Sequence, residues 1–386
     1  MLFSCHNDNA DGTQDNARDF VHSKENPNQD FSNVLKLHLL AGGSISNERN
    51  DIEDQICLYK RGLGGESESK LIRGINSLRG KLSQQTVPMR EMLEGVYEEG
   101  DELYIVGFSR GSASARAFVA DLDESGLKTA RGETVEKPPV KFLGCFDTVS
   151  DQIKNLVQHL ENRVSKSITK SSVVGEIDGK LSSIVETAVH NVAMDDNRQW
   201  GGVPSFPPCL MDSKDERIHE AWFPGEHGDV GGSVGHKGLA DGSLEYMQEW
   251  MKKCGFKFLE KGEDIHPVCL KIPNHEDLDK DVDASRMNII PAPGQNPNWQ
   301  QTQQWEDPSY RFVTAVTNEE PIPDATVRIH KSCFDHYEAM QNGEDKFKPI
   351  NQSLLECKNI VVVGSLDEEL EDETKKLKAL IAAANN

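Results

Sequence analysis

The sequence places a serine between two glycines at the end of an apolar run. Residues 103–111 read LYIVGFSRG, so that Ser109 stands in a G-x-S-x-G pattern. In such a pattern the serine sits on a sharp turn between a strand and a helix, and small neighbours let the two backbones approach closely. An apolar strand precedes Ser109, and a helix-forming segment follows it at residues 112–122. Ser109 is therefore the candidate nucleophile of a serine hydrolase, and the alternative is a structural serine in an ordinary turn.

A nucleophilic serine needs a base and an orienting acid, and both have candidates further along the chain. Asp147 follows the next strand-like segment, and His227 lies in the glycine-rich exit of a later one. The carboxyl ends of parallel strands share one edge of a sheet, so these side chains should meet near Ser109. Asp229 is the rival acid and His330 is the rival base.

Hydrolysis by a serine also needs two backbone N–H groups to hold the developing oxyanion. The first belongs to the residue after the nucleophile, which is Arg110. The second is expected from the loop after the strand MLFSCH, where Gly12 and Thr13 are the candidates. The alternative for these two residues is a common Asp-Gly turn.

Composition excludes some classes of protein. The formal net charge of −22 over 386 residues argues against binding of nucleic acid, which requires clustered Lys and Arg. The eight cysteines are scattered without a C-x-x-C spacing, as expected of buried reduced thiols, and no metal or cofactor is predicted. A metal-dependent hydrolase built on His227, Asp229 and His236 is a competing hypothesis.

The N-terminal residues MLFSCHNDNADGTQDN lack the basic and long apolar segments of a secretory signal. No run approaches the roughly 18 consecutive apolar residues that span a membrane. We therefore expect the protein to be made in the cytoplasm and to meet a membrane only at its surface.

The order of elements predicts an α/β fold. Strand-like and helical segments alternate over the first 150 residues, which is typical of a mostly parallel sheet with helices on both faces. Later segments add a strand, a helix, a late strand pair, a short strand and a C-terminal helix. Strands are predicted at residues 1–6, 54–65, 102–108, 138–149, 309–318, 323–332 and 358–365, and residues 217–232 are predicted to begin as a strand and end in glycines. Helices are predicted at residues 33–41, 68–98, 112–122, 242–256 and 366–384. Asn33 is the predicted N-cap of the first helix.

Two parts of the chain are predicted. Residues 1–260 form an α/β-hydrolase core that lacks the usual N-terminal antiparallel strands. Within them, residues 151–190 lack strand patterns and are a candidate lid insertion, with an ordinary core helix as the alternative. Residues 261–386 form a C-terminal extension, with a long loop, late strands and a terminal helix packed on the core.

Several stretches together resemble one family, the DUF2235 proteins, which include the Tle1-like phospholipase effectors of type VI secretion. They occur in the family's order over roughly the first 260 residues. The matching stretches are DGTQDN (11–16), SNVLKL (32–37), YKRGLG (59–64), EEGDELYIVGFSRGSASAR (98–116), KFLGCFDTVS (141–150), HNVAMDDNR (190–198) and AWFPGEHGDVGG (221–232).

The resemblance implies an α/β-hydrolase fold and a Ser-Asp-His esterase that acts on phospholipid. It assigns Ser109 as nucleophile and His227 as base, and we interpret Asp147 as the acid. Asp195, Asp196 and Arg198 also match a family motif, and we prefer for them a structural ion pair or a helix cap.

The resemblance also implies phospholipid membrane as the substrate surface, with an immunity protein or a secretion apparatus as candidate partners. The biological role would be that of an antibacterial toxin or a defence effector. The alternatives are a soluble carboxylesterase or thioesterase acting on a small ester, and a non-catalytic interaction protein with the hydrolase fold.

Overall fold

A computed structural model of the chain describes thirteen segments, and the account below concerns these residues. They are 2–7, 31–60, 83–149, 180–196, 199–200, 203–204, 208–232, 237–260, 265–266, 311–317, 320–322, 324–335 and 351–385.

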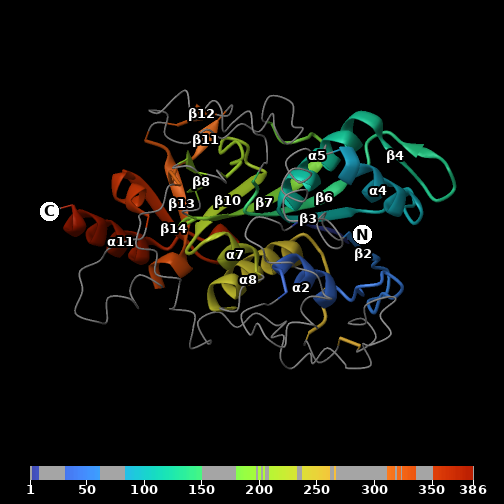
Figure 1. Ribbon diagram of the computed structural model, residues 1–386, viewed down its shortest axis with the longest axis horizontal. Coiled ribbons are helices and arrows are strands. Elements are labelled where there is room, and N and C mark those ends of the chain that lie inside the picture. Colours follow the sequence, from blue (N-terminus) through green and yellow to red (C-terminus); the bar gives the residue numbers. More distant parts are fainter. Residues whose placement is uncertain are drawn as a thin grey trace.

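A central sheet runs through the described part of the chain (Figure 1). Its eight strands are ordered β14-β13-β10-β7-β6-β3-β1-β2, and every neighbouring pair is parallel. The strands are β1 (Leu2–Asn7), β2 (Cys57–Lys60), β3 (Leu103–Ser109), β6 (Val140–Phe146), β7 (Val185–Ala193), β10 (Ile218–Phe223), β13 (Thr326–His330) and β14 (Asn359–Val363).

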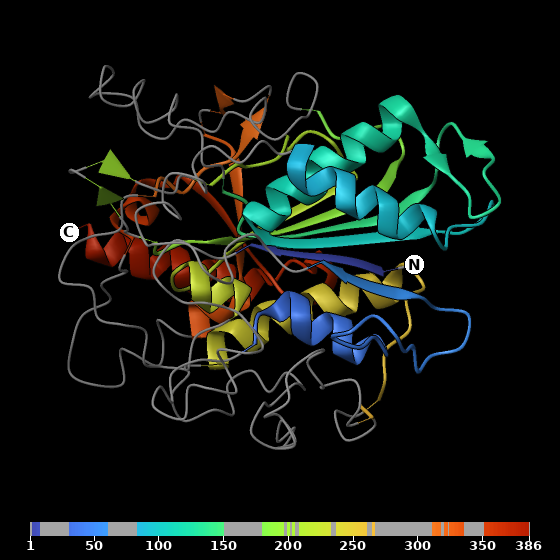
Figure 2. The same cartoon turned by 45° about the vertical axis from the view of Figure 1, so that its right-hand side comes forward.

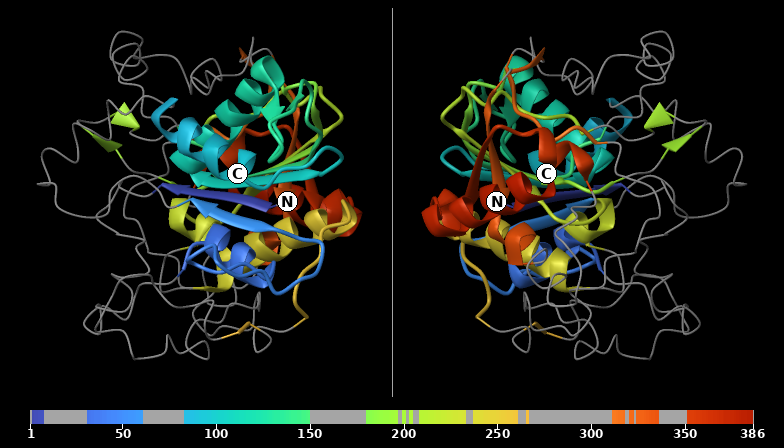
Figure 3. Two further views of the ribbon diagram at one scale, coloured as in Figure 1. Left: turned by 90° about the vertical axis from the view of Figure 1, so that its right-hand side faces the viewer. Right: turned by 90° about the vertical axis from the view of Figure 1, so that its left-hand side faces the viewer.

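Helices cover both faces of this sheet (Figures 2 and 3). Helices α4 and α5 lie on one face, and α2 and α8 lie on the other. The helices are α2 (Asn33–Leu40), α4 (Ser83–Glu94), α5 (Arg110–Ser125), α7 (His227–Gly231), α8 (Lys237–Lys253) and α11 (Glu371–Ala384). The predicted fold class, an α/β fold with a mostly parallel sheet, is confirmed.

The described segments outside the central sheet also contain short antiparallel ladders and 3-10 helices. Three two-stranded antiparallel ladders pair β4 (Leu127–Lys128) with β5 (Thr134–Val135), β8 (Gln199–Trp200) with β9 (Val203–Pro204), and β11 (Val316–Thr317) with β12 (Glu320–Pro321). Two 3-10 helices, η5 (Gln352–Glu356) and η6 (Ser365–Asp367), flank β14.

Every residue of strand β3 is buried, and the strand is apolar apart from Tyr104 and the terminal Ser109, as expected of a strand covered on both faces. Alternate side chains enter different cores: Tyr104 and Val106 pack with the residues of α2 and α8. Leu103 and Ile105 pack instead with the residues of α4 and α5. This double burial explains why the strand before Ser109 was recognisable as a continuous apolar run.

The order in which the chain adds strands to the sheet changes direction between β1 and β3. From β1 the chain passes to β2 on one side, whereas β3 and the later strands lie on the other. Parallel sheets bind ligands outside the carboxyl ends of their strands at such a switch point. Asn7, the last residue of β1, is in register with Ser109, so this point lies beside the candidate nucleophile.

Strand β7 corrects one sequence prediction. Residues 151–190 were expected to lack strands, yet Val185–Ala193 forms a strand inside the sheet, between β6 and β10. Its pattern was missed because the polar residues His190 and Asn191 are fully buried in its second half. Residues 151–179, which contain most of the candidate lid, lie outside the described residues.

The first helix is capped one residue earlier than predicted. Ser32 is the N-cap of α2, and its hydroxyl accepts a hydrogen bond from the Leu35 N–H. Asn33 instead donates its side-chain amide to the carbonyls of Val230 and Ala240 at 2.9 and 2.8 Å, tying α2 to α7 and α8.

The C-terminal segments join the same sheet. Strands β13 and β14 extend it beyond β10, and α11 packs on β14 through Leu377 and Ile381. The predicted division of the chain near residue 260 stays a prediction. Among the described residues, no helix is both long and apolar enough to cross a membrane.

Candidate active site

Ser109 stands at the turn between β3 and α5. Its backbone has φ of 61° and ψ of −128°, a conformation that non-glycine residues rarely adopt. The first turn of α5 passes so close to β3 that a Cβ atom on Gly107 would lie 2.5 Å from the Gly111 carbonyl oxygen. Only glycine fits at this position. Strain of this kind occurs at functional sites, where it fixes the direction of a side chain.

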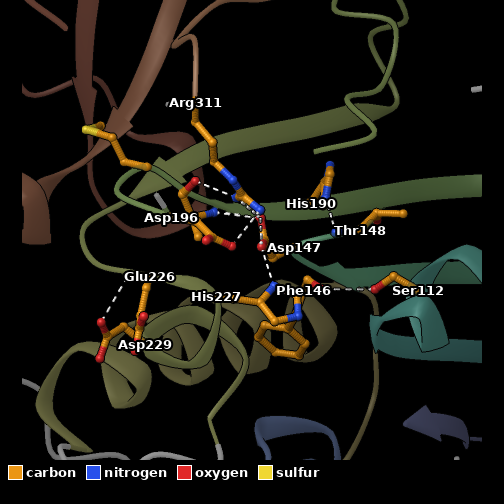
Figure 4. A network of polar contacts seen from close by, with 12 residues as sticks. Ser112, Phe146, Asp147, Thr148, His190, Asp196, Glu226, His227, Asp229 and Arg311 are labelled. Atoms are coloured by element: carbon orange, nitrogen blue, oxygen red, sulfur yellow. Dashed lines mark hydrogen bonds and ion pairs between the residues drawn. The ribbon is translucent and has the colours of Figure 1, made fainter. Parts of the chain in front are cut away.

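The turn is fastened by Ser112, the residue after the second glycine. Its hydroxyl lies 2.7 Å from the Gly107 carbonyl oxygen and 3.1 Å from that of Phe146. These contacts link α5 to the ends of β3 and β6 (Figure 4). The backbone N–H of Arg110 lies in the first turn of α5, at the positive end of the helix dipole.

Asp147 and His227 are brought together by the ends of β6 and β10. The His227 Nδ1 atom lies 2.5 Å from the Asp147 Oδ2 atom, and both side chains are buried (Figure 4). The imidazole stacks obliquely on Phe108, the residue before Ser109, with ring centroids 4.5 Å apart. Because Asp147 accepts at Nδ1, Nε2 is the nitrogen left to accept a proton. Nε2 is buried and has no hydrogen-bond partner among the described residues.

Arg311 is a member of the site that sequence reasoning missed. Its guanidinium donates to Asp147 Oδ1 at 2.6 Å and to Asp147 Oδ2 at 2.9 Å. It also donates to the Ala193 carbonyl at 2.7 Å and to Asp196 Oδ2 at 3.2 Å. The Ala193 N–H donates to Asp147 Oδ1 at 2.9 Å, so each carboxylate oxygen of Asp147 accepts two hydrogen bonds.

These contacts keep Asp147 ionised although it is wholly buried. Burial is the largest influence and would raise the pKa of this carboxyl, but the Arg311 charge and the hydrogen bond from His227 together outweigh it. The pKa of Asp147 is therefore held well below its ordinary value. An ionised acid at this place can accept a hydrogen bond from the Nδ1–H group of His227 throughout the neutral range.

A second buried histidine supports the loop that carries Asp147. His190 Nε2 accepts from the Thr148 N–H at 3.0 Å, and its Nδ1 lies 2.8 Å from Glu220 Oε2. His190 and Glu220 are directly opposite each other in the ladder of β7 and β10. The pair therefore ties Thr148, the residue after Asp147, to β7, which lies beside β6, and to β10, the next strand in the sheet.

Asp229, the rival acid, and His330, the rival base, contact other residues. Asp229 caps α7, because its Oδ2 accepts from the Glu226 N–H at 2.9 Å. His330 stacks on Phe223 with ring centroids 4.3 Å apart and lies 2.8 Å from the Ser332 hydroxyl. The structure thus brings His227 to Asp147 and places neither rival in that hydrogen bond.

The family-motif aspartates make structural contacts as preferred from the sequence. Asp196 pairs with Arg311, and Asp195 Oδ2 accepts from the Gly225 N–H at 2.7 Å in the loop before His227. Four further candidates lie outside the described residues: Gly12, Thr13, Arg198 and His236.

Three of these side chains are also of the kind that binds metal ions. One ligand atom from each of Asp147, Asp196 and His227 lies within 4.8 Å of the others. The Arg311 guanidinium donates to both carboxylates, so a cation of the protein already balances this cluster.

The sequence model of the family described as "T6SS, Phospholipase effector Tle1-like, catalytic domain" matches residues 9–137 and 127–250, which is more than half of the chain. The chain belongs to this Tle1-like family. No curated protein matches the chain.

Two solved structures are similar to this Tle1-like chain. One is described as an uncharacterized protein from Pseudomonas aeruginosa, with 16% identity and a TM-score of 0.37 over 70% of this chain. The other is the Tle1 effector bound to the VgrG spike from the type 6 secretion system, with 19% identity and a TM-score of 0.32 over 60% of this chain. The chain covers 47% and 51% of these proteins, about half the length of each.

Asp229 of the Tle1-like chain should make stability depend on pH in an unusual direction. Burial raises the pKa of Asp229 to about 7, and Asp195 adds to the rise. A raised folded-state pKa gives a contribution that is complete below the unfolded value near 4 and is lost as pH rises toward 7. We expect the free energy of unfolding of Asp229→Asn, measured with urea, to exceed that of the wild type by about 2 kcal/mol at pH 8 and to match it at pH 4.5. An equal difference between the two proteins at both pH values would contradict this expectation.

Proposed function

We propose that this protein is a serine phospholipase in which Ser109 is the nucleophile, His227 the general base and Asp147 the orienting acid. The observation that carries the proposal is the buried hydrogen bond between His227 Nδ1 and Asp147, with Nε2 left open beside the strand that ends in Ser109. The family to which the chain belongs supports phospholipid as the substrate class.

In this mechanism the Ser109 hydroxyl attacks the carbonyl carbon of an acyl ester while His227 Nε2 accepts its proton. Asp147 holds the Nδ1–H tautomer and stabilises the imidazolium that forms. The protonated imidazole then gives its proton to the departing alcohol oxygen, which releases the lysophospholipid. Water, activated by the same imidazole, hydrolyses the acyl-serine and releases the fatty acid.

The negative oxygen of the tetrahedral intermediate would be held by two backbone N–H groups. The Arg110 N–H at the start of α5 is one, aided by the positive end of the helix dipole. The other would come from Gly12 or Thr13, which follow β1 in the sequence, and the last residue of that strand, Asn7, is in register with Ser109. No cofactor enters these steps.

The substrate would be the ester at the first or second glycerol carbon of a membrane phospholipid, as in phospholipases of the A1 or A2 type. The protein would be made in the cytoplasm and delivered by a type VI secretion apparatus, acting as an antibacterial toxin or defence effector. An immunity protein and a component of that apparatus are the proposed partners, and the family description, which names an effector of type VI secretion, supports the second of them.

The test is hydrolysis of mixed phospholipid vesicles whose lipids carry a different chain at each glycerol carbon. The wild type should release lysolipid and fatty acid in equal amounts, and the retained chain identified by mass spectrometry gives the position cleaved. A chelator should leave the rate unchanged, whereas a loss would favour a metal-dependent hydrolase. Hydrolysis of short soluble esters without attack on vesicles would move the assignment to a soluble carboxylesterase or thioesterase.

A further inference from the structure

Arg311 comes from a part of the chain that the family's sequence model does not match, yet its side chain ends within the candidate site. The matched residues end at 250 and contain Ser109, Asp147 and His227. The Arg311 residue is only 3% exposed, so its charge faces the protein rather than solvent. Burying a charge costs free energy unless the charge is well paired. The partners of the Arg311 guanidinium therefore indicate what the residue does.

The contacts of Arg311 converge on the acid. Two nitrogens of one guanidinium hold both oxygens of Asp147, the geometry in which arginine fixes a carboxylate most firmly. The same group reaches the Ala193 carbonyl at the end of β7 and the Asp196 carboxylate beyond it (Figure 4). Arg311 thus joins the loop after β6 to the loop after β7, the two segments that border the acid.

We propose that Arg311 is a positioning residue that orients the Asp147 carboxylate toward His227 Nδ1, so that the segment from residue 311 completes the active site. This inference rests on the proposed function, because it assumes that Asp147 serves His227 in catalysis. Arg311 has no contact with the reacting atoms in this scheme and acts only through Asp147.

Loss of Arg311 would change both the direction and the charge of the acid. Without the guanidinium, Asp147 Oδ1 keeps one hydrogen bond, from the Ala193 N–H, and the carboxylate can turn away from the imidazole. Burial would then raise the pKa of Asp147, opposed by the hydrogen bonds from His227 and the Ala193 N–H. The charged or titratable groups that remain around it are His227, Asp196 and, through Thr148, His190. A protonated, neutral Asp147 carries no negative charge to stabilise the imidazolium of His227.

The experiment compares Arg311→Gln and Arg311→Lys with a matched control, Arg217→Gln, in the full chain. Arg217 makes similar contacts at the other end of β10, to the Asp215 carboxylate at 2.6 and 2.9 Å and to the Val185 carbonyl at 2.8 Å. We expect Arg311→Gln to lower kcat on phospholipid vesicles about a hundredfold with KM within about threefold of the wild type. The acid limb of its pH–rate profile should move to higher pH.

The two other variants separate positioning from folding. Arg311→Lys keeps the charge but not the double hydrogen bond, and should recover part of the lost kcat. Arg217→Gln should lose thermal stability and keep its kcat and pH profile. If Arg311→Gln instead behaves like Arg217→Gln, then Arg311 is a structural ion-pair residue and the inference is overturned.

A second readout does not depend on activity. The proton between His227 Nδ1 and Asp147 should give a far-downfield proton NMR resonance in the wild type and in Ser109→Ala. We expect this resonance to vanish in Arg311→Gln, and its persistence would overturn the inference. If the wild type shows the resonance but cleaves no phospholipid, only the proposed function is contradicted. The NMR comparison of wild type and Arg311→Gln would still test whether Arg311 orients Asp147 toward His227.

Discussion

Replacing Ser109 by alanine should lower kcat for phospholipid hydrolysis by about a million-fold and leave the protein folded. The alanine variant has no oxygen to attack the ester, and only the remaining oxyanion donors and substrate binding can assist water. The Ser109 side chain makes no capping hydrogen bond to α5, so its loss removes no cap from that helix. Initial rates on vesicles, together with thermal unfolding followed by circular dichroism, measure both effects.

Ser109→Gly extends this prediction to stability. The serine has φ of 61° and ψ of −128°, which glycine adopts without strain from a Cβ atom. We therefore expect the glycine variant to be inactive but more stable than the alanine variant by about 1 kcal/mol in urea unfolding. Such a trade between stability and activity is typical of a strained functional residue.

Ser114→Ala is the matched control, because Ser114 lies one turn further along α5 and donates to the Arg110 carbonyl at 3.0 Å. It should keep the wild-type rate within about threefold, as expected of a substitution away from the reacting atoms. If Ser109→Ala keeps more than a tenth of the wild-type rate while the fold is intact, the nucleophile must lie elsewhere.

The part of the site that was predictable from the sequence depends on local patterns. Ser109 is flanked by an apolar strand, two glycines and a helix-forming segment, all within twenty residues, and the alternation of strands and helices places its strand in a parallel sheet. Asp147 and His227 each follow a recognisable strand, so the rule that strand ends share one edge was enough to bring them together.

Arg311 could not be found in this way. It lies 164 residues from Asp147 in the chain, next to a segment rich in Pro, Asn and Gln that has no periodicity. A single arginine beside aromatic and aliphatic residues is far more often a surface residue than a buried one. Only the tertiary structure shows that its charge is enclosed.

The buried histidine and its partner were missed for a related reason. His190 and Glu220 are directly opposite each other in neighbouring strands, but this pairing depends on the register of β7 and β10. This register can be derived only when β7 is known to be a strand. The sequence does not predict that strand, because β7 contains buried polar residues.

Replacing Asp147 by asparagine should lower kcat about ten-thousandfold, second in size only to the loss of the nucleophile. An amide cannot carry the negative charge that stabilises the imidazolium, and its NH2 group can turn the His227 ring to the wrong tautomer. The rate should be measured beside Asp229→Asn, because Asp229 is the rival acid but caps α7 instead of contacting His227. Asp229→Asn is expected to stay within about tenfold of the wild type.

Asp147→Asn should also destabilise the fold, since it removes the carboxylate that accepts from two nitrogens of the buried Arg311. Removing one member of a buried ion pair costs about 3 kcal/mol. The pKa of Asp147 is depressed in the folded state, so its contribution is present above the unfolded value near 4 and is lost as pH falls below that value. The difference in urea stability between wild type and Asp147→Asn should therefore be full at pH 7 and shrink below pH 4. A rate loss in Asp229→Asn that exceeds the loss in Asp147→Asn would assign the acid to Asp229 and would remove the basis for a role of Arg311.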